Sequence, residues 1–206
     1  MKKIKQKFLL ILFIAVSVTF TVTAQTNKME LISNVAAQEL ASYLNKIPVG
    51  QEKMFGFNNR GEFSEASIGE PYEMLTLNND FFIDKFIVRD KDYIMSTGNW
   101  RIPIIVNKQH RALLTISKVN NEWHVVKIGA KGFAEELEMF NKNHPLINKL
   151  YILRVFQLKS DFVLTSNEII HPLTSAKRSL SIEDDKNIRY SIYDLLILVK
   201  SKIVIN

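Results

Sequence analysis

The feature that most constrains the fold is the alternation of apolar residues between Asn99 and Ala130. In "NWRIPIIVNKQHRALLTISKVNNEWHVVKIGA", large aliphatic side chains recur at every second position over long runs. Successive side chains of a β-strand point to opposite faces of a sheet, so this spacing predicts strands with one buried face. Polar breaks near residues 107–110 and 119–121 divide the stretch into a three-strand antiparallel meander.

The meander can bury a single face if its two turns set the right register. We expect Ile104 to lie opposite Leu114, with an odd-length or bulged turn at each break. Burial of each large side chain contributes roughly 1.5–3 kcal/mol, which outweighs the preference of any single turn. The predicted core face consists of Trp100, Ile102, Ile104, Val106, Ala112, Leu114, Ile116, His124, Val126 and Ile128.

The opposite face of the meander is half apolar and half polar. Its predicted rows are Arg101 with Ser117 and Trp123, Pro103 with Thr115 and Val125, and Ile105 with Leu113 and Lys127. Three roles stay open for such a face: exposure to solvent, cover by the C-terminal segment, or the floor of a shallow pocket. The candidate surface for a ligand or partner consists of Arg101, Thr115, Ser117, Trp123 and Lys127.

The first residues have the organisation of a secretory signal. Four lysines precede an apolar run from Phe8, and small residues follow at 22–24. We expect cleavage after Ala24, with the mature chain, 25–206, in the periplasm or outside the cell. The alternative is a retained membrane anchor, but hydroxyl residues interrupt a run that is shorter than the ~20 apolar residues of a spanning helix.

Loss of the signal changes the charge balance of the chain. The formal net charge falls from +6 to +2 because four lysines leave. The remaining lysines are dispersed among acidic residues, so no nucleic-acid partner is expected. The chain has no cysteine. Its stability must therefore come from a hydrophobic core, and its length suits a single domain, with 146–206 as a possible subsidiary lobe.

Outside the meander, apolar spacing predicts three helices and several strands. The helices span residues 27–48, 132–145 and 190–203, and a capping box of Ser191 and Asp194 begins the last. The apolar run at 190–203 could also be a strand. Short strands are expected within 49–77, and two or three more within 149–173, whereas 78–92 has no clear pattern.

These elements predict an α+β fold. Hairpin-linked strands without crossover helices form antiparallel ladders. We expect a curled antiparallel sheet of about five to seven strands with the helices gathered on one side. A long N-terminal helix before a curled meander suggests an analogy with cystatin-like or NTF2-like folds, which carries no function.

The sequence contains none of the common catalytic motifs. G-x-S-x-G, S-x-x-K, H-E-x-x-H and Gly-rich phosphate loops are all absent. The histidines are His110 in a turn, His124 on the core face, and His144 and His171, each directly before a proline. None has zinc-ligand spacing, and the acidic segments at 90–92 and 183–185 lack the calcium-loop pattern. We expect neither a metal nor a cofactor.

Several segments resemble exported proteins of unknown function from Bacteroidota. They are the Thr-Ala-Gln junction at 23–25, "GEPYEML", "NWRIPIIVN", "VKIGAKGFAEEL" and "HPLTSAKRSL". The resemblance spans most of the mature chain. It implies a periplasmic or extracellular setting and no activity.

The leading functional hypothesis is an exported, non-enzymatic module that binds a protein, peptide or small apolar ligand through the mixed face or its rim. The alternatives are a secreted hydrolase with a dispersed catalytic site and an accessory, chaperone-like protein. A Ser or Asp within hydrogen-bond reach of one of the four histidines in a cleft would favour the hydrolase.

Overall fold

The computed structural model describes residues 28–88, 92–183 and 188–204. The predicted signal and its predicted cleavage site lie outside the described residues. The strands are β1 (Ser67–Ile68), β2 (Tyr72–Leu77), β3 (Ile94–Val106), β4 (Gln109–Val119), β5 (Glu122–Gly129), β6 (Leu150–Val155), β7 (Ser160–Thr165), β8 (Ile169–Pro172) and β9 (Tyr190–Ser191). The helices are the N-terminal helix at 28–45, α2 (Asn79–Ile83), α3 (Lys131–Asn143), α4 (Thr174–Leu180) and α5 (Ile192–Val204).

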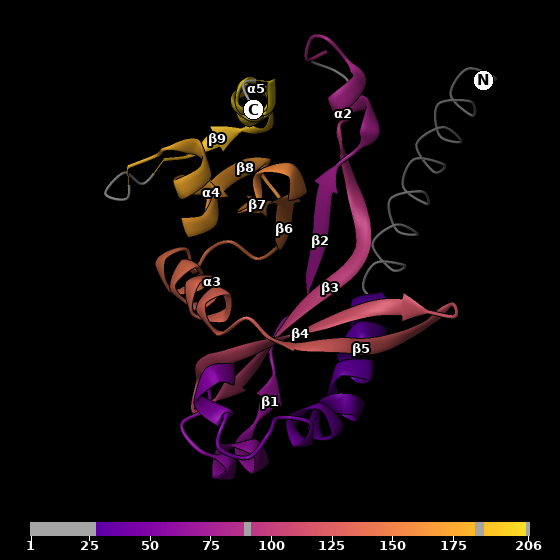
Figure 1. Cartoon of the computed structure of the whole chain (residues 1–206), viewed down its shortest axis with the longest axis vertical. Helices are drawn as coiled ribbons and strands as arrows, with labels where there is room; N and C mark the ends of the chain where they lie inside the picture. Colours follow the sequence, from indigo (N-terminus) through magenta and orange to yellow (C-terminus); the bar gives the residue numbers. More distant parts are fainter. Residues whose placement is uncertain (1–27, 89–91, 184–187, 205–206) are drawn as a thin grey trace, which may run out of the picture.

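The strands form one sheet in the order β5-β4-β3-β2-β6-β7-β8-β9, with β1 beside β3 (Figure 1). This arrangement confirms the α+β class, but the nine strands exceed the predicted five to seven. The sheet is open rather than curled, because its outer strands β5 and β9 do not meet. The pair β2–β6 is parallel, unlike the other pairs. The meander and α3 intervene between these two strands and return the chain across the sheet.

The N-terminal helix packs on one face of the meander. Its buried side chains, Ile32, Ala36, Leu40 and Leu44, recur at every fourth position, the spacing of one helix face. They contact the predicted core residues of β3 and β4, of which Trp100, Ile102, Ile104, Leu114 and Ile116 are all at most 2% exposed. We call this cluster the N-terminal core.

A second cluster, the C-terminal core, lies under α4 and α5. It contains Leu153, Phe162 and Ile170 of the sheet together with Leu195 and Val199 of α5. The predicted C-terminal helix and its cap are confirmed, since the Ser191 hydroxyl accepts a hydrogen bond from the Asp194 N–H at 3.1 Å. Helix α4 was not predicted, because seven residues are too few to show a clear helical period.

Helix α3 covers the other face of the sheet. Its Ala134, Leu137 and Phe140 pack with Leu113 and Ile152, whose sequence neighbours Leu114 and Leu153 belong to the first two clusters. Neighbouring residues of a strand point to opposite faces. The expectation that the helices gather on one side is therefore wrong, because both faces of the central strands are apolar.

Residues 49–66 form two 3-10 turns, Glu52–Phe55 and Arg60–Glu65, where short strands were expected. Gly56 ends the first turn with φ of 97°, and a Cβ there would lie 1.9 Å from the carbonyl oxygen of Arg111. This close approach docks the turn on β4. Among the described residues, no helix is long and apolar enough to cross a membrane.

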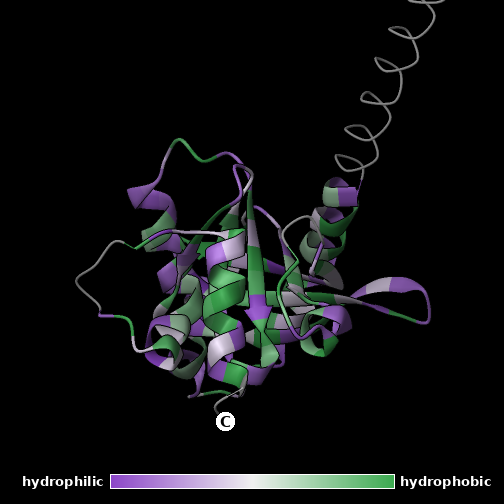
Figure 2. Ribbon diagram, turned by 90° about the horizontal axis from the view of Figure 1, so that it is seen from above, coloured by the Kyte–Doolittle hydropathy of each residue, from purple (hydrophilic) through white to green (hydrophobic). Residues whose placement is uncertain are grey.

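The two hairpins of the meander differ in register. In the first hairpin, Ile104 lies opposite Ala112 and Leu114 opposite Ile102, with a bulge near the turn. The predicted pairing of Ile104 with Leu114 is therefore wrong by two residues, and the predicted core face of β3 and β4 is kept because a shift of two preserves the facing. In the second hairpin, Thr115 pairs with Lys127 but Ile116 pairs with Val125, so Val126 is an extra residue in the middle of β5. The tip of this hairpin projects from the molecule and is hydrophilic (Figure 2).

The outer edge of β5 is closed by the N-terminal helix. The Tyr43 hydroxyl donates a hydrogen bond to the carbonyl of Val125, and the Val125 N–H donates to the Glu39 carboxylate at 3.2 Å. Unpaired N–H and C=O groups on an edge strand can recruit another chain. Here both groups of Val125 have side-chain partners.

Candidate functional site

The structure separates the residues of the predicted ligand surface. Arg101, Thr115 and Lys127 are cross-strand neighbours, and the Arg101 guanidinium donates a hydrogen bond to the Thr115 hydroxyl. Ser117 donates instead to the side-chain carbonyl of Asn99. Trp123 lies on the opposite face, against the N-terminal core.

The placement of Trp123 corrects the predicted rows. The turn at Asn120 and Asn121 has two residues, both with positive φ, which suits a tight hairpin rather than an odd-length loop. Between this turn and the bulge, the facing of β5 is inverted. Val125 is therefore buried at 1% exposure, whereas Val126 is 43% exposed. His124 is not a core imidazole; its side chain is 44% exposed and contacts Glu39 at 3.2 Å.

The mixed face is largely filled. Helix α3 covers it at Leu113, in place of the C-terminal segment, and Thr115 is only 9% exposed. Burial lowers the pKa of Arg101, an effect that the nearby carboxylate of Asp161 opposes. Arg101 and Thr115 therefore contribute to contacts within the sheet and offer little surface to a ligand.

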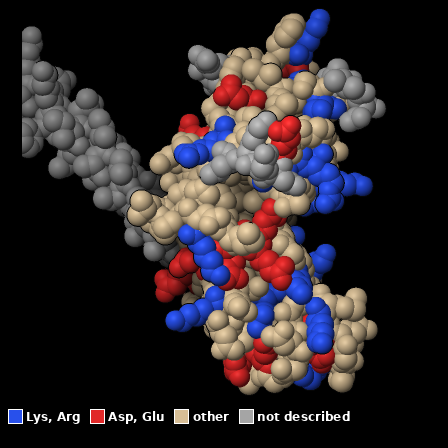
Figure 3. Space-filling view, turned by 90° about the vertical axis from the view of Figure 1, so that its left-hand side faces the viewer, with Lys and Arg blue, Asp and Glu red and all other residues tan. Residues whose placement is uncertain are grey.

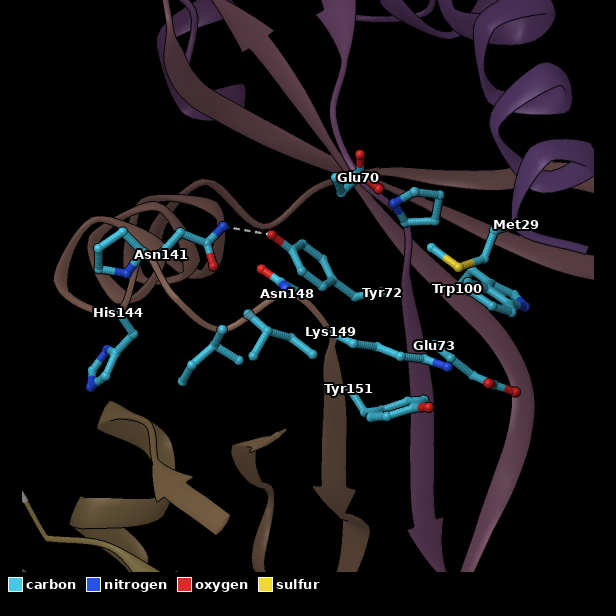
Figure 4. A pocket seen from close by; sticks show the side chains of 14 residues that line it. Met29, Glu70, Tyr72, Glu73, Trp100, Asn141, His144, Asn148, Lys149 and Tyr151 are labelled. Atoms are coloured by element: carbon cyan, nitrogen blue, oxygen red, sulfur yellow. Dashed lines mark hydrogen bonds between the residues drawn. The ribbon is translucent and has the colours of Figure 1, made fainter. Parts of the chain in front are cut away.

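A cleft opens at the rim of this face, where β2 and β6 begin. The β2–β6 cavity has a volume of about 180 Å³. Its walls come from the N-terminal helix, β2, β3, α3 and the segment between α3 and β6 (Figure 4). The cavity lining includes Met29, Glu70, Tyr72, Glu73, Trp100, Asn141, His144, Asn148, Lys149 and Tyr151.

Two buried aromatic side chains line the β2–β6 cavity from opposite faces of the sheet. Tyr72 is 5% exposed, and its hydroxyl accepts a hydrogen bond from the Asn141 amide at 2.7 Å. Burial raises the pKa of Tyr72, so its hydroxyl keeps a proton that it can donate. Trp100 is 2% exposed, and its indole N–H has no hydrogen-bond partner among the described residues.

Charged side chains lie on the same face of the sheet as Trp100, because Glu73 is its cross-strand neighbour. The Glu73 carboxylate is 3.6 Å from the Lys28 ammonium and accepts a hydrogen bond from Ser96 at 2.7 Å. Lys28 also lies 5.2 Å from the centre of the Trp100 ring. Lys149 lies 5.3 Å over the Tyr151 ring and extends toward Glu73 (Figure 4). A ligand would meet aromatic rings with the Lys149 ammonium and the Glu73 carboxylate beside them.

Beside the β2–β6 cavity, His144 contacts a second histidine, His171, which is distant in the sequence. The ring centres of His144 and His171 are 4.9 Å apart, and Phe140 stacks on His144 at 4.3 Å. His144 Nδ1 lies 3.0 Å from the Phe140 carbonyl oxygen. Burial, aided by His144 and Arg189, lowers the pKa of His171 to about 4. The spacing of 27 residues gave no signal of this contact in the sequence.

None of the four imidazoles has a Ser hydroxyl or Asp carboxylate as a partner in the part of the chain that the structure describes. The polar contacts of the rings are those of His124 with Glu39 and Glu122, of His144 with a backbone carbonyl and of His110 with the backbone of Ala134. His110 Nδ1 is buried without a partner. Within residues 28–88, 92–183 and 188–204, no group of three or more His, Asp or Glu is placed to hold a metal ion.

Basic and acidic side chains are interspersed on the face shown in Figure 3. This face therefore offers no extended surface of a single charge sign. Compared with known proteins, the chain matches no protein-family model, no curated protein and no solved structure.

Proposed function

We propose that this chain is an exported, non-enzymatic binding module that receives one aromatic or apolar group of a peptide or small ligand in the β2–β6 cavity. The observation that carries the proposal is a cavity of about 180 Å³ with aromatic walls and a polar rim. An apolar cavity of roughly 150 Å³ is large enough to bind benzene. One ring of a ligand therefore fits.

The polar groups of the rim support recognition rather than simple filling. Binding sites commonly combine apolar walls with a few polar groups that orient the ligand. Here the Tyr72 hydroxyl and the Lys149 ammonium stand on opposite sides of the cavity (Figure 4). They can donate hydrogen bonds to a carbonyl or carboxylate attached to the bound ring.

The same geometry supports binding over the hydrolase alternative. Nucleophilic catalysis requires a nucleophile within hydrogen-bond reach of a base. His144 is the histidine of the cavity wall, and its Nδ1 faces a backbone carbonyl. The proposal therefore assigns no catalytic residue, metal or cofactor.

The test is binding of small aromatic probes. We expect p-cresol and N-acetyl-phenylalanine to show saturation-transfer NMR signals with the purified protein. Met29→Trp should fill the cavity and abolish these signals, because Met29 is part of its wall. Met139→Trp, the same change on an exposed position of α3, is the matched control and should bind normally. Equal signals from both variants would exclude the cavity as the site.

Export is tested separately. The basic start, apolar run and small residues before Gln25 support cleavage of a signal. N-terminal sequencing of protein recovered from the periplasm or culture medium should begin at Gln25. Recovery of an intact, membrane-bound chain would contradict export by this route.

A further inference from the structure

A groove beside residues 67–71 adjoins the β2–β6 cavity. A second cavity, of about 430 Å³, shares Glu70, Tyr72 and Asn141 with the first. Its other walls include Ile68 and His110. The hydrogen bond between Tyr72 and Asn141 therefore stands where the two cavities join, and both follow the same segment of chain.

This segment has a free strand edge. Among the described strands, β1 pairs only with β3. The Gly69 N–H donates to the Pro103 carbonyl at 2.8 Å. Because alternate residues of an antiparallel ladder bond to the partner strand, Ile68 and Glu70 direct their N–H and C=O groups away from β3. Those groups face the groove.

The free edge ends where β6 begins. Strand β6 pairs with β2 from Glu73 onward, with Tyr151 opposite Glu73. No described strand continues the line of β6 beside residues 67–71. The edge is also held in place, because a Cβ at Gly69 would approach the Ile105 side chain to 2.9 Å. The edge is short, because β1 spans only Ser67–Ile68 and Pro71 has no N–H. The groups that it offers to an added strand are those of Ile68 and Glu70.

Charge at the groove selects the kind of peptide. Glu70 is exposed at the junction of the two cavities, and its carboxylate has no hydrogen-bond or ion-pair partner among the described residues. It can pair with a Lys or Arg side chain. The aromatic walls of the β2–β6 cavity lie directly beyond it.

We propose that the groove binds an extended, basic peptide as an added strand in line with β6, with one aromatic residue of the peptide in the β2–β6 cavity. This inference rests on the proposed function and names the ligand class of the same site. Main-chain hydrogen bonds to the edge supply affinity in this mode of recognition, and pockets for alternate side chains supply specificity.

The test uses a fluorescein-labelled peptide, Ser-Lys-Val-Tyr-Val-Lys-Ser, blocked at both ends, and versions with one N-methylated backbone amide each. An added strand bonds to the edge through every second residue. We expect N-methylation to weaken binding about tenfold at alternate positions and less than about twofold between them, measured by fluorescence anisotropy. A uniform effect along the peptide would overturn strand addition.

The charge element is tested on the protein. Glu70→Lys should weaken peptide binding about tenfold. Glu168→Lys, the same change at the exposed turn between β7 and β8, should leave it unchanged. Both variants alter exposed side chains, and thermal melts will show that both fold. Equal affinity of the two variants would overturn the role of Glu70.

The inference and the proposed function fail in different ways. If p-cresol binds and Met29→Trp blocks it, but the N-methyl series shows no alternation, the cavity function stands and strand addition falls. If p-cresol does not bind and Met29→Trp does not change peptide affinity, both fall. Alternation of the N-methyl effect together with loss of peptide binding in Met29→Trp supports both.

Discussion

The two hairpins of the meander have the same kind of turn and different registers. Each turn has two residues with positive φ, Asn107 and Lys108 in the first and Asn120 and Asn121 in the second. In the first hairpin the bulge lies beside the turn, so nearly all of both strands keep the predicted facing. In the second it lies in mid-strand. The position of the extra residue, more than turn length, decides which side chains are buried.

The largest effect is expected from a pair of charge substitutions in β5, which test this difference between the hairpins. Val125→Asp should lower the free energy of unfolding by at least about 3 kcal/mol, because an unpaired carboxylate would enter the N-terminal core. Val126→Asp should lower it by less than about 1 kcal/mol, since Val126 is exposed. Urea unfolding measures both. A larger loss of unfolding free energy in Val126→Asp than in Val125→Asp would favour the regular alternation that the sequence predicts.

A second test breaks the contact that closes β5. Tyr43→Phe removes the partner of the Val125 carbonyl and should cost about 1 kcal/mol. Tyr190→Phe is the control, because burial alone, without a hydrogen bond among the described residues, acts on the Tyr190 hydroxyl. Chemical denaturation of the two variants gives the comparison. An unchanged free energy of unfolding in Tyr43→Phe would show that water replaces the Tyr43 hydroxyl as the partner of the Val125 carbonyl.

A third test compares the turns themselves. Lys108 has φ of 63° and Asn121 has φ of 67°. Glycine adopts this conformation without strain, and Asn tolerates it better than Lys. Lys108→Gly should raise the free energy of unfolding by about 1 kcal/mol, and Asn121→Gly should raise it by about a third as much. Both changes are measured as shifts in melting temperature. A larger gain at Asn121 would contradict the assignment of strain to Lys108.

The smallest expected effect is on pH dependence. Burial lowers the pKa of His110 on the first hairpin below 6.5, against the opposing carboxylate of Glu138. The unfolded chain then binds more protons than the folded one, so stability falls as the pH drops below 6.5. His110→Gln should reduce this slope in melts between pH 7 and pH 5. An unchanged slope in His110→Gln would show that this imidazole does not contribute to the pH dependence.

The limits of prediction from this sequence have specific physical causes. The core face of β3 and β4 follows from alternation, and the capping of α5 follows from Ser191 and Asp194. The facing of Trp123 does not follow from alternation. The bulge in β5 turns Trp123 toward the N-terminal core and His124 toward solvent, and the sequence around these two residues alternates regularly in either facing. The β2–β6 cavity gave no local signal, since Met29, Tyr72 and Lys149 come from three distant segments.

The order of synthesis gives one contact a further meaning. Tyr43 and Glu39 precede Val125 by more than 80 residues. A chain that emerges from its N-terminus therefore presents the closing helix before the strand that needs it. When β5 appears, a partner from its own molecule is already at hand, in competition with any neighbouring chain. The N-terminal helix thus occupies, from within the same molecule, backbone groups of Val125 that an edge strand otherwise offers to another chain.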